Sequence, residues 1–439
     1  MAEQSLFSEF EARSKADWMA QIEADLKGKK PSELHKQWQD LEVDPFKSKT
    51  DLSKNTSCFR ERKEWFIAQA FCVDTPKETN ARILEALMEG VNSIEIAGLN
   101  SKEELEATLE SVNPEYIQTN FKLGEWMFSG GLEAAENWAK HAAGGSWGFD
   151  PLGKLYRTKS WYRNQEEDIK LIEKLSKSSL EQLNWLEING ADFHNEGAYA
   201  STELALSLAM FNEYLAVLAD PAKDAGKLEF KAGVGVLYFI ELTKLRSLRT
   251  LAGAVAAEYG YSGDLFISAN TGTWGMSAYD RHNNLLRSST QIMAAAIGGA
   301  DAISATPFDL SLETDHRFAR HLSRMQHQML IEESFLDRVI DPMAGSYFLE
   351  SLQADLEQKA WAKFQTIEKE GGFIQALASG LVSEMVHEDR QKQFKELESG
   401  ELSVLGVNLY PNKEEQLSAE IRVDLNRLSS ETEKGRANG

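Results

Sequence analysis

The sequence predicts an α/β protein, a (β/α)8 TIM barrel with a helical N-terminal arm and C-terminal helices. Eight strand-like segments, each followed by a helical pattern, recur at intervals of roughly 25 to 40 residues between residues 64 and 345. The stretch from Asp264 to Asp309 reads as strand, helix and strand, which implies a parallel strand pair with a helical crossover. We therefore expect an arm at residues 1–55, a barrel at 56–350 and a helical extension at 351–439.

The expected strands are short segments that are apolar or alternate between apolar and polar residues. The segment containing Gly148 and Pro151 is the weakest of them, because both residue types interrupt strands. The expected strands are residues 65–73, 93–97, 115–121, 146–152, 185–189, 228–234, 266–270 and 301–306.

The expected helices follow from apolar residues at helical spacing and from start signals. Thr75 to Glu78 fits a capping box with proline at the first helical position, and Ser101 to Glu104 fits a second capping box. The expected barrel helices are residues 76–88, 102–109, 132–142, 166–175, 202–218, 238–258, 283–297 and 317–333, and further helices follow from residue 346 to about residue 397.

The first residues, Met1 to Lys54, are polar and helix-prone, with a sparse apolar stripe. That stripe consists of Phe7, Phe10, Trp18, Ile22 and Leu26. A segment with so few apolar residues cannot hold a core of its own, so we expect it to dock on another surface. Two surfaces fit equally well: the chain's own barrel, or a partner over which the arm is laid.

The formal net charge of −22 argues against nucleic acid or an anionic membrane surface as a partner. The chain shows neither a signal-peptide pattern nor an apolar stretch of 18 residues, so we expect a soluble cytoplasmic protein. Two cysteines, Cys58 and Cys72, fit neither a disulfide framework nor a zinc site. His316, His321 and His327 share one expected helix, but their spacing places no pair one turn apart, so we expect no metal site.

The last two expected strands carry small or polar residues at positions that can face the barrel axis. These residues are Ser268, Asn270, Ala302, Ser304 and Thr306. Barrel interiors are ordinarily filled by Val, Ile and Leu. The pattern therefore fits an axis with open space or, equally, a sheet packed closely against its helices.

One segment in this region resembles the adenosylcobalamin-dependent acyl-CoA mutases, chiefly methylmalonyl-CoA mutase. Catalytic chains of that family read roughly FHTQTAGVSLTAQQPYNNIVRTT where this chain reads ISANTGTWGMSAYDRHNNLLRSS, from Ile267 to Ser289. IDPMAGSYFLESL, from Ile340, and the preceding MQHQMLIEES are similar to two later family segments. The resemblance covers roughly residues 64–352 and implies the family's barrel.

The same resemblance implies that the family's chemistry is lost in this chain. Ser268 stands where the family has a histidine beside the reacting acyl group, and His194 stands where it has an arginine that clamps the substrate carboxylate. Ser268, Asn270 and His194 would then be remnants of a substrate pocket, without catalytic or cofactor-binding residues. The residues after Gly345 are also too few for the cobalamin-binding domain of the family's catalytic chains.

Residues Asp192 to Gly197 fit D-x-H-x-x-G, a pattern with which cobalamin-binding domains offer an imidazole to cobalt. The aspartate would orient the histidine ring as a ligand. Three fixed residues make a weak pattern, and this one follows an expected barrel strand rather than opening a separate domain. We therefore interpret it as a barrel loop.

Within the family, the chain most resembles the small, non-catalytic subunits of heterodimeric methylmalonyl-CoA mutase. This implies a homologous large catalytic subunit as partner, which would hold both adenosylcobalamin and the acyl-CoA. Together they would interconvert methylmalonyl-CoA and succinyl-CoA in propionate metabolism, and this chain alone would be inactive. One alternative is an active barrel chain that uses a separate cobalamin-binding protein, as isobutyryl-CoA mutase does. Another is an unrelated barrel enzyme, for which Asp74, His194, Ser268 and Asn270 make a poor acid–base set.

Overall fold

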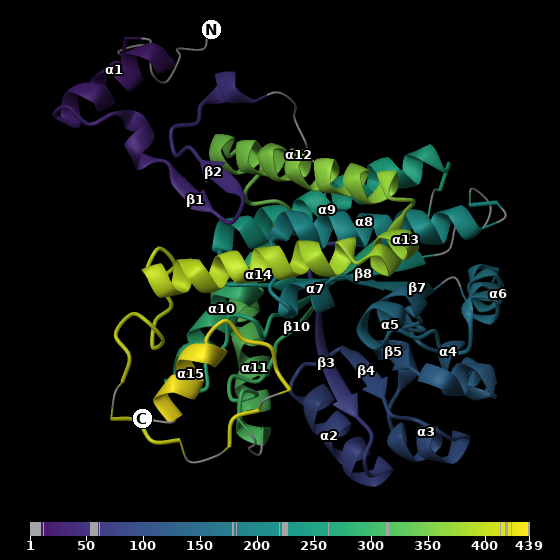
Figure 1. Ribbon diagram of the computed structural model, residues 1–439. Helices are drawn as coiled ribbons and strands as arrows, with labels where there is room; N and C mark the ends of the chain where they lie inside the picture. The colour runs from purple at the N-terminus through teal and green to yellow at the C-terminus, as the bar shows by residue number, and fades with distance from the viewer. Residues whose placement is uncertain are drawn as a thin grey trace, which may run out of the picture.

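The computed structural model confirms the closed parallel barrel (Figure 1). It describes residues 10–437 except 12, 53–59, 61, 178–179, 181, 219, 222–226, 262, 313–315, 413, 418–419 and 423, so Phe7 and Cys58 lie outside the described residues. Neighbouring strands are parallel, and β10 closes the barrel by pairing with both β9 and β3. The strands are β3 (Phe66–Cys72), β4 (Ser93–Ala97), β5 (Gln118–Lys122), β6 (Gly144–Ser146), β7 (Leu183–Asn189), β8 (Lys227–Val234), β9 (Leu265–Thr271) and β10 (Ala302–Ser304).

Helices surround the barrel, as the alternating pattern predicts. The second predicted capping box is partly formed, since the Ser101 side chain accepts a hydrogen bond from the Glu104 amide, whereas Thr75 makes no side-chain cap and Pro76 opens its helix. A π-helical turn, Met329–Glu333, extends α11. The surrounding helices are α2 (Pro76–Met88), α3 (Lys102–Thr108), α4 (Gly131–Ala139), α5 (Pro151–Thr158), α6 (Gln165–Ser176), α7 (Ala191–Asn195), α8 (Ala200–Val217), α9 (Tyr238–Glu258), α10 (His282–Ile297) and α11 (Arg317–Gln328).

The expected strand at 146–152 is wrong in its bounds. The strand is Gly144–Ser146, and residues from Pro151 onward form α5. The Asp150 side chain caps this helix by accepting a hydrogen bond from the Gly153 amide at 2.9 Å, and Pro151 is at its first position. Gly145 has φ +142°, and a Cβ there would lie 2.0 Å from the Thr119 carbonyl oxygen. Only glycine therefore allows this strand to approach β5 so closely.

The apolar core lies between the strands and the helices outside them. Alternate strand residues point outward and are fully buried, among them Ile94, Phe121, Leu186, Phe230 and Ile303. On one side a second layer forms, because α12 (Tyr347–Lys369) packs across α8 and α9 (Figure 1). The C-terminal helices α13 (Phe373–Ser379) and α14 (Leu381–Ser399) follow, and α15 (Ser430–Ala437) is the last.

The N-terminal arm divides into two parts. A hairpin of β1 (Lys36–Trp38) and β2 (Leu41–Val43) docks on the chain's own helices, where Leu41 and Val43 are buried and Trp38 stacks on Phe239. In contrast, α1 (Lys15–Asp25) buries no residue. Figure 1 shows α1 at the top of the molecule, away from the barrel strands. A short 3-10 turn at 31–34 connects α1 to the hairpin, and another at 49–51 follows the hairpin.

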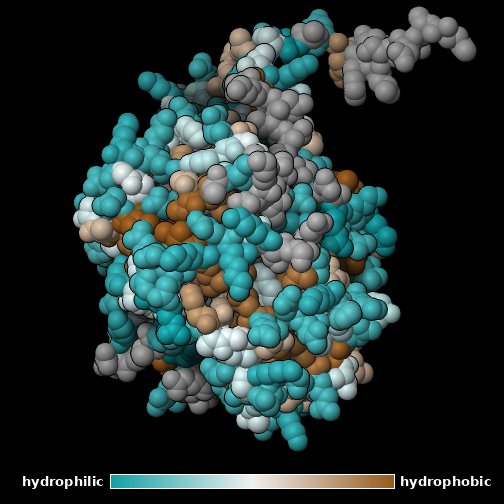
Figure 2. All heavy atoms as spheres, turned by 90° about the vertical axis from the view of Figure 1, so that its right-hand side faces the viewer, coloured by the Kyte–Doolittle hydropathy of each residue, from teal (hydrophilic) through white to brown (hydrophobic). Residues whose placement is uncertain are grey.

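The surface is mainly hydrophilic on the face drawn in Figure 2, with apolar side chains in scattered patches. This agrees with the strongly acidic composition of the chain. None of the helices described here has the length and apolar character needed to cross a membrane.

Candidate functional site

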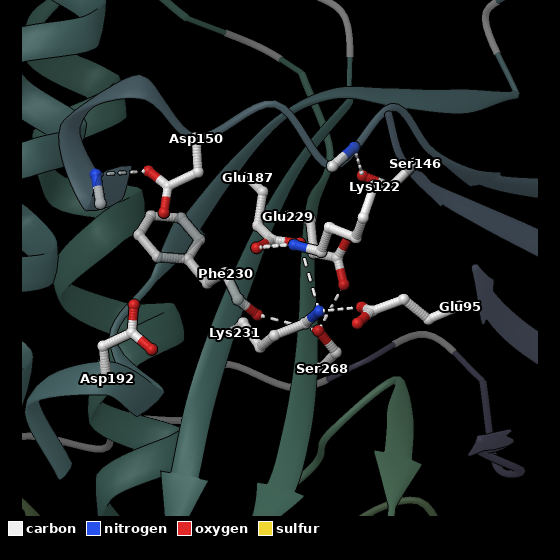
Figure 3. A network of polar contacts seen from close by, with 12 residues as sticks. Glu95, Lys122, Ser146, Asp150, Glu187, Asp192, Glu229, Phe230, Lys231 and Ser268 are labelled. Atoms are coloured by element: carbon white, nitrogen blue, oxygen red, sulfur yellow. Dashed lines mark hydrogen bonds and ion pairs between the residues drawn. The ribbon is translucent and has the colours of Figure 1, made fainter. Parts of the chain in front are cut away.

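The two halves of the barrel present different side chains to the axis. Strands β3, β9 and β10 place Phe66 and Phe266 on this face near their beginnings and small or short polar residues beyond them, namely Ala68, Ala70, Ser268, Asn270, Ala302 and Ser304. Strands β4, β5, β7 and β8 offer long charged residues, namely Glu95, Lys122, Glu187, Glu229 and Lys231 (Figure 3). The long side chains extend toward the short ones, and a cavity remains beside Ala68, Ala70, Asn270 and Ser304. The interior is therefore neither an ordinary apolar core nor an open channel.

These charged residues form one network of ion pairs. Lys231 pairs with Glu95 and lies 3.2 Å from Glu187, which also pairs with Lys122 (Figure 3). Both Glu187 and Lys231 are almost fully buried. A buried charge is tolerated only when partners offset its loss of hydration, so these side chains must keep their arrangement for the barrel to be stable.

The network changes the protonation of its members. Burial alone would raise the pKa of Glu187, but Lys122 and Lys231 outweigh it and lower this pKa to about 2. Burial alone would lower the pKa of Lys231, but Glu187, Glu95 and Glu229 hold it well above its ordinary value. Among the described residues, Ser268 is the one hydrogen-bond donor to Glu229, and burial raises the pKa of Glu229. Near neutral pH, Glu187 and Lys231 therefore carry full charges on the axis.

The three predicted pocket residues lie in three different surroundings. Ser268 donates a hydrogen bond to Glu229 and belongs to the axis network. Asn270 lines a cavity of about 240 Å³ that it shares with the axis-facing Ala68, Ala70 and Ser304 and that extends to Arg324 and His327 of α11. His194 lines a third space, at the C-terminal end of the barrel. They do not converge on one substrate pocket.

His194 belongs to α7, the short helix between β7 and α8. Its Nδ1 lies 3.5 Å from Glu203, and the same carboxylate binds the Lys244 ammonium at 2.6 Å and the Gly233 amide at 2.9 Å. Burial would raise the pKa of Glu203, but Lys244 and the His194 hydrogen bond lower it below its ordinary value. Glu203 is therefore ionised and accepts the proton of Nδ1.

Asp192 does not orient this histidine. Its carboxylate pairs with Arg157, whose guanidinium also lies 3.6 Å from Asp150. A metal-binding histidine needs a hydrogen-bond partner for its second ring nitrogen. Here Glu203, and not Asp192, lies beside Nδ1 of the His194 ring. Among the described residues, no group of three His, Cys, Asp or Glu side chains could hold a metal ion.

The C-terminal ends of the strands are covered by the chain itself. Gln393 of α14 accepts a hydrogen bond from the Trp274 indole at 2.9 Å and donates one to the Gly197 carbonyl at 2.6 Å. Buried Glu433 of α15 accepts a hydrogen bond from the Ala278 amide at 2.8 Å. A cavity of about 530 Å³ remains beneath this cover, with His194 in its wall.

Sequence reasoning missed both the axis network and the cover. A signal for the network was present in β8, where Glu229 and Lys231 alternate with the apolar residues Leu228, Phe230 and Ala232. A charged residue at every second position of a buried strand indicates a charged interior face. No sequence pattern within α15 predicts that this helix packs over the C-terminal end of the barrel.

Long stretches of this chain match a protein family and several curated proteins. The family model for methylmalonyl-CoA mutase matches residues 127–436. The methylmalonyl-CoA mutase small subunit of Porphyromonas gingivalis is 30% identical, over 93% of this chain and 71% of that protein. The small subunit of Streptomyces virginiae is 32% identical, over 79% of this chain and 58% of that protein. The large subunit of Propionibacterium freudenreichii subsp. shermanii is 29% identical, over 56% of this chain and 35% of that protein.

Proposed function

The chain belongs to the methylmalonyl-CoA mutase family, and from this membership we propose that it acts as the small, non-catalytic subunit of a heterodimeric mutase. It is similar to small subunits of that family over most of its length. In this proposal the complex interconverts methylmalonyl-CoA and succinyl-CoA in the cytoplasm, as part of propionate metabolism. The homologous large subunit binds the acyl-CoA and adenosylcobalamin.

The observation that carries the non-catalytic role is the charged network on the barrel axis. Glu95, Glu187 and Lys231 meet there, so an acyl-CoA could pass along the axis only by breaking buried ion pairs. Removing one partner of such a pair typically costs about 3 to 5 kcal/mol. A substrate would have to supply this energy before any chemistry began. The small residues Ser268 and Ala302 lie on the same face of the sheet as this network.

The C-terminal face supports the expectation that this chain binds no cobalamin itself. Gln393 and Glu433 tie α14 and α15 to the loops that follow the strands. The cavity of about 530 Å³ beneath them has the size that ordinary small ligands need, and a corrinoid is larger. The residues that line this cavity therefore do not fit that cofactor.

The exposed helix α1 supports pairing with a second chain. It buries no residue on the barrel, and Trp18 is 41% exposed. Aromatic side chains on an interface contribute more binding energy than charged residues at its rim. The large subunit is the partner that the family relationship favours.

The test compares this chain alone, a large mutase subunit from the same source alone, and the two together, each with adenosylcobalamin and methylmalonyl-CoA. We expect a 1:1 complex with full turnover, none from this chain alone, and unchanged turnover when the complex carries Ser268→Ala in this chain. Turnover by this chain alone would refute the proposal. Turnover only after adding a separate cobalamin-binding protein would favour the active-chain alternative.

A further inference from the structure

The cavity beneath α14 contains a buried nitrogen without a hydrogen-bond partner. His194 is 5% exposed, and its Nε2 atom is fully buried with no partner among the described residues. Leaving such a group unsatisfied costs about 1 to 3 kcal/mol, so its presence in a folded protein requires an explanation. His194 lines a cavity that can hold a small molecule.

The contacts of the ring determine what Nε2 can bind. Nδ1 faces the Glu203 carboxylate, which is held ionised by Lys244. A neutral ring with its proton on Nδ1, facing Glu203, leaves on Nε2 a lone pair that accepts a hydrogen bond. A ligand atom at this position must be a donor, such as a hydroxyl or an amine.

The ring is held in place by glycines on three sides. A Cβ at Gly233 would lie 2.4 Å from the ring carbon Cγ, one at Gly272 would lie 2.4 Å from Nε2, and one at Gly235 would lie 2.9 Å from Cε1. Side chains at these positions would displace the imidazole. The backbone at the ends of β8 and β9 therefore holds the imidazole ring of His194 in one position, as preorganised binding sites require.

The walls of the cavity define the rest of the ligand. The apolar lining comprises Val236, Leu237, Trp274, Met276 and Leu428. Three carboxylates, of Glu241, Glu396 and Glu401, and two basic groups, of Lys36 and Arg287, also line the cavity, and Glu241 pairs with Lys244 at 2.6 Å.

The basic groups offer an anion little. Arg287 is engaged, since it donates hydrogen bonds to the Asn284 side chain at 2.7 Å and to the Leu405 carbonyl at 2.5 Å. The carboxylates of Glu396 and Glu401 and the acceptor at Nε2 disfavour carboxylates and phosphates, and hence CoA esters.

We propose that this cavity binds a small neutral or cationic molecule with an apolar body, which donates a hydroxyl or amine hydrogen bond to His194 Nε2. The entrance lies beside Val236 and Leu405, which line the cavity and are 42% and 45% exposed. The site is separate from the charged axis and does not depend on the role proposed above. Occupancy would stabilise α14 and the segment after it, because both form walls of the cavity.

Four matched probes test the proposal on the full chain: 2-phenylethanol, 2-phenylethylamine, 3-phenylpropionate and propylbenzene. They share a phenyl ring and differ in the group that would meet His194. Calorimetric titration should show binding of the alcohol and the amine, and at least about fivefold weaker binding of the other two, as expected for one lost hydrogen bond. Equal binding of all four, tighter binding of the carboxylate, or no binding of any probe would overturn the proposal.

Two variants and one spectroscopic measurement locate the binding. His194→Leu removes the acceptor and should remove the preference for the alcohol over propylbenzene. Val236→Trp blocks the entrance at an exposed position and should abolish binding with His194 intact. The exposed His141→Gln is the matched control and should bind normally. With histidine labelled at Cε1, 2-phenylethanol should shift the His194 resonance and leave that of His141 in place; the reverse would overturn the assignment.

Discussion

The ammonium group of Lys231 lies 3.2 Å from the carboxylate of Glu187 on the neighbouring strand, at the centre of the barrel. Their side chains are 8% and 1% exposed. Lys231→Met keeps the side-chain length and removes the charge, which leaves three carboxylates facing Lys122 alone. We expect the free energy of unfolding to fall by about 3 to 5 kcal/mol, measured by urea denaturation.

An exposed pair provides the control for this experiment. Lys170 and Glu166 lie 2.5 Å apart on the surface of α6, with side chains 66% and 78% exposed. Lys170→Met should leave the unfolding curve unchanged, because solvent screens such pairs. The double variant Lys231→Met/Glu187→Gln should recover part of the loss, since it removes an uncompensated buried charge. Equal effects at Lys231 and Lys170 would show that the axis network does not hold the barrel together.

A second prediction concerns the dependence of stability on pH. Burial lowers the pKa of His327 to about 3, from an ordinary value of 6.5. Its folded pKa is depressed, so its contribution to stability is fully present above pH 6.5 and is lost as pH falls toward 3. Asp150 has the opposite effect on the pH dependence. Burial raises the pKa of its carboxyl group from 3.8 to about 6, so its contribution to the free energy of unfolding is lost as the pH rises through 6.

Replacing His327 should therefore make the free energy of unfolding less dependent on pH below pH 6.5. Between pH 6.5 and 5, the His327→Gln variant should lose about 1.6 kcal/mol less stability than the original chain, because the unfolded histidine is half protonated at pH 6.5 and almost fully protonated at pH 5. Urea denaturation at several pH values measures this. His141→Gln, which alters an exposed histidine, should leave the slope unchanged. Parallel profiles for His327→Gln and the original chain would contradict the prediction.

The order of strands and helices was predictable because its signals are local. The helix Tyr238–Glu258 and the strand Ser93–Ala97 agree with the prediction residue for residue. The strand expected at 146–152 failed because Pro151 and the capping side chain of Asp150 begin a helix there.

The surroundings of the candidate site were not predictable in the same way. Lys231 meets Glu95 across 136 residues of sequence, and only the closed barrel brings the two together. His194 was singled out by its position in a motif, but its partner is Glu203 rather than the nearby Asp192. A motif records spacing along the chain, whereas the partner of a buried ring depends on how the helices pack.

A third prediction concerns the cover of the C-terminal face. Glu433 is 2% exposed, accepts hydrogen bonds from the Ala278 amide and the Ser429 hydroxyl, and pairs with Arg427 at 2.7 Å. Glu433→Ala should open this cover locally and speed hydrogen exchange of the Ala278 amide by about 100-fold. Glu431→Ala removes only an exposed pair with Lys434 and should leave exchange unchanged. Unchanged exchange in both variants would show that α15 does not secure the face.

The last prediction separates the two parts of the N-terminal arm. Helix α1 is attached by an ion pair between Lys15 and Asp51 at 2.5 Å and by the packing of Trp18 on Phe46. Deleting residues 1–30 should therefore change the free energy of unfolding by no more than about 1 kcal/mol. It should weaken binding to the large subunit by at least about tenfold, measured by light scattering, because it removes exposed aromatic side chains. Leu41→Ala, in the docked hairpin, should instead destabilise the fold by about 2 to 5 kcal/mol. If the shortened chain unfolds, α1 belongs to the barrel; if it associates undiminished, α1 lies outside the interface.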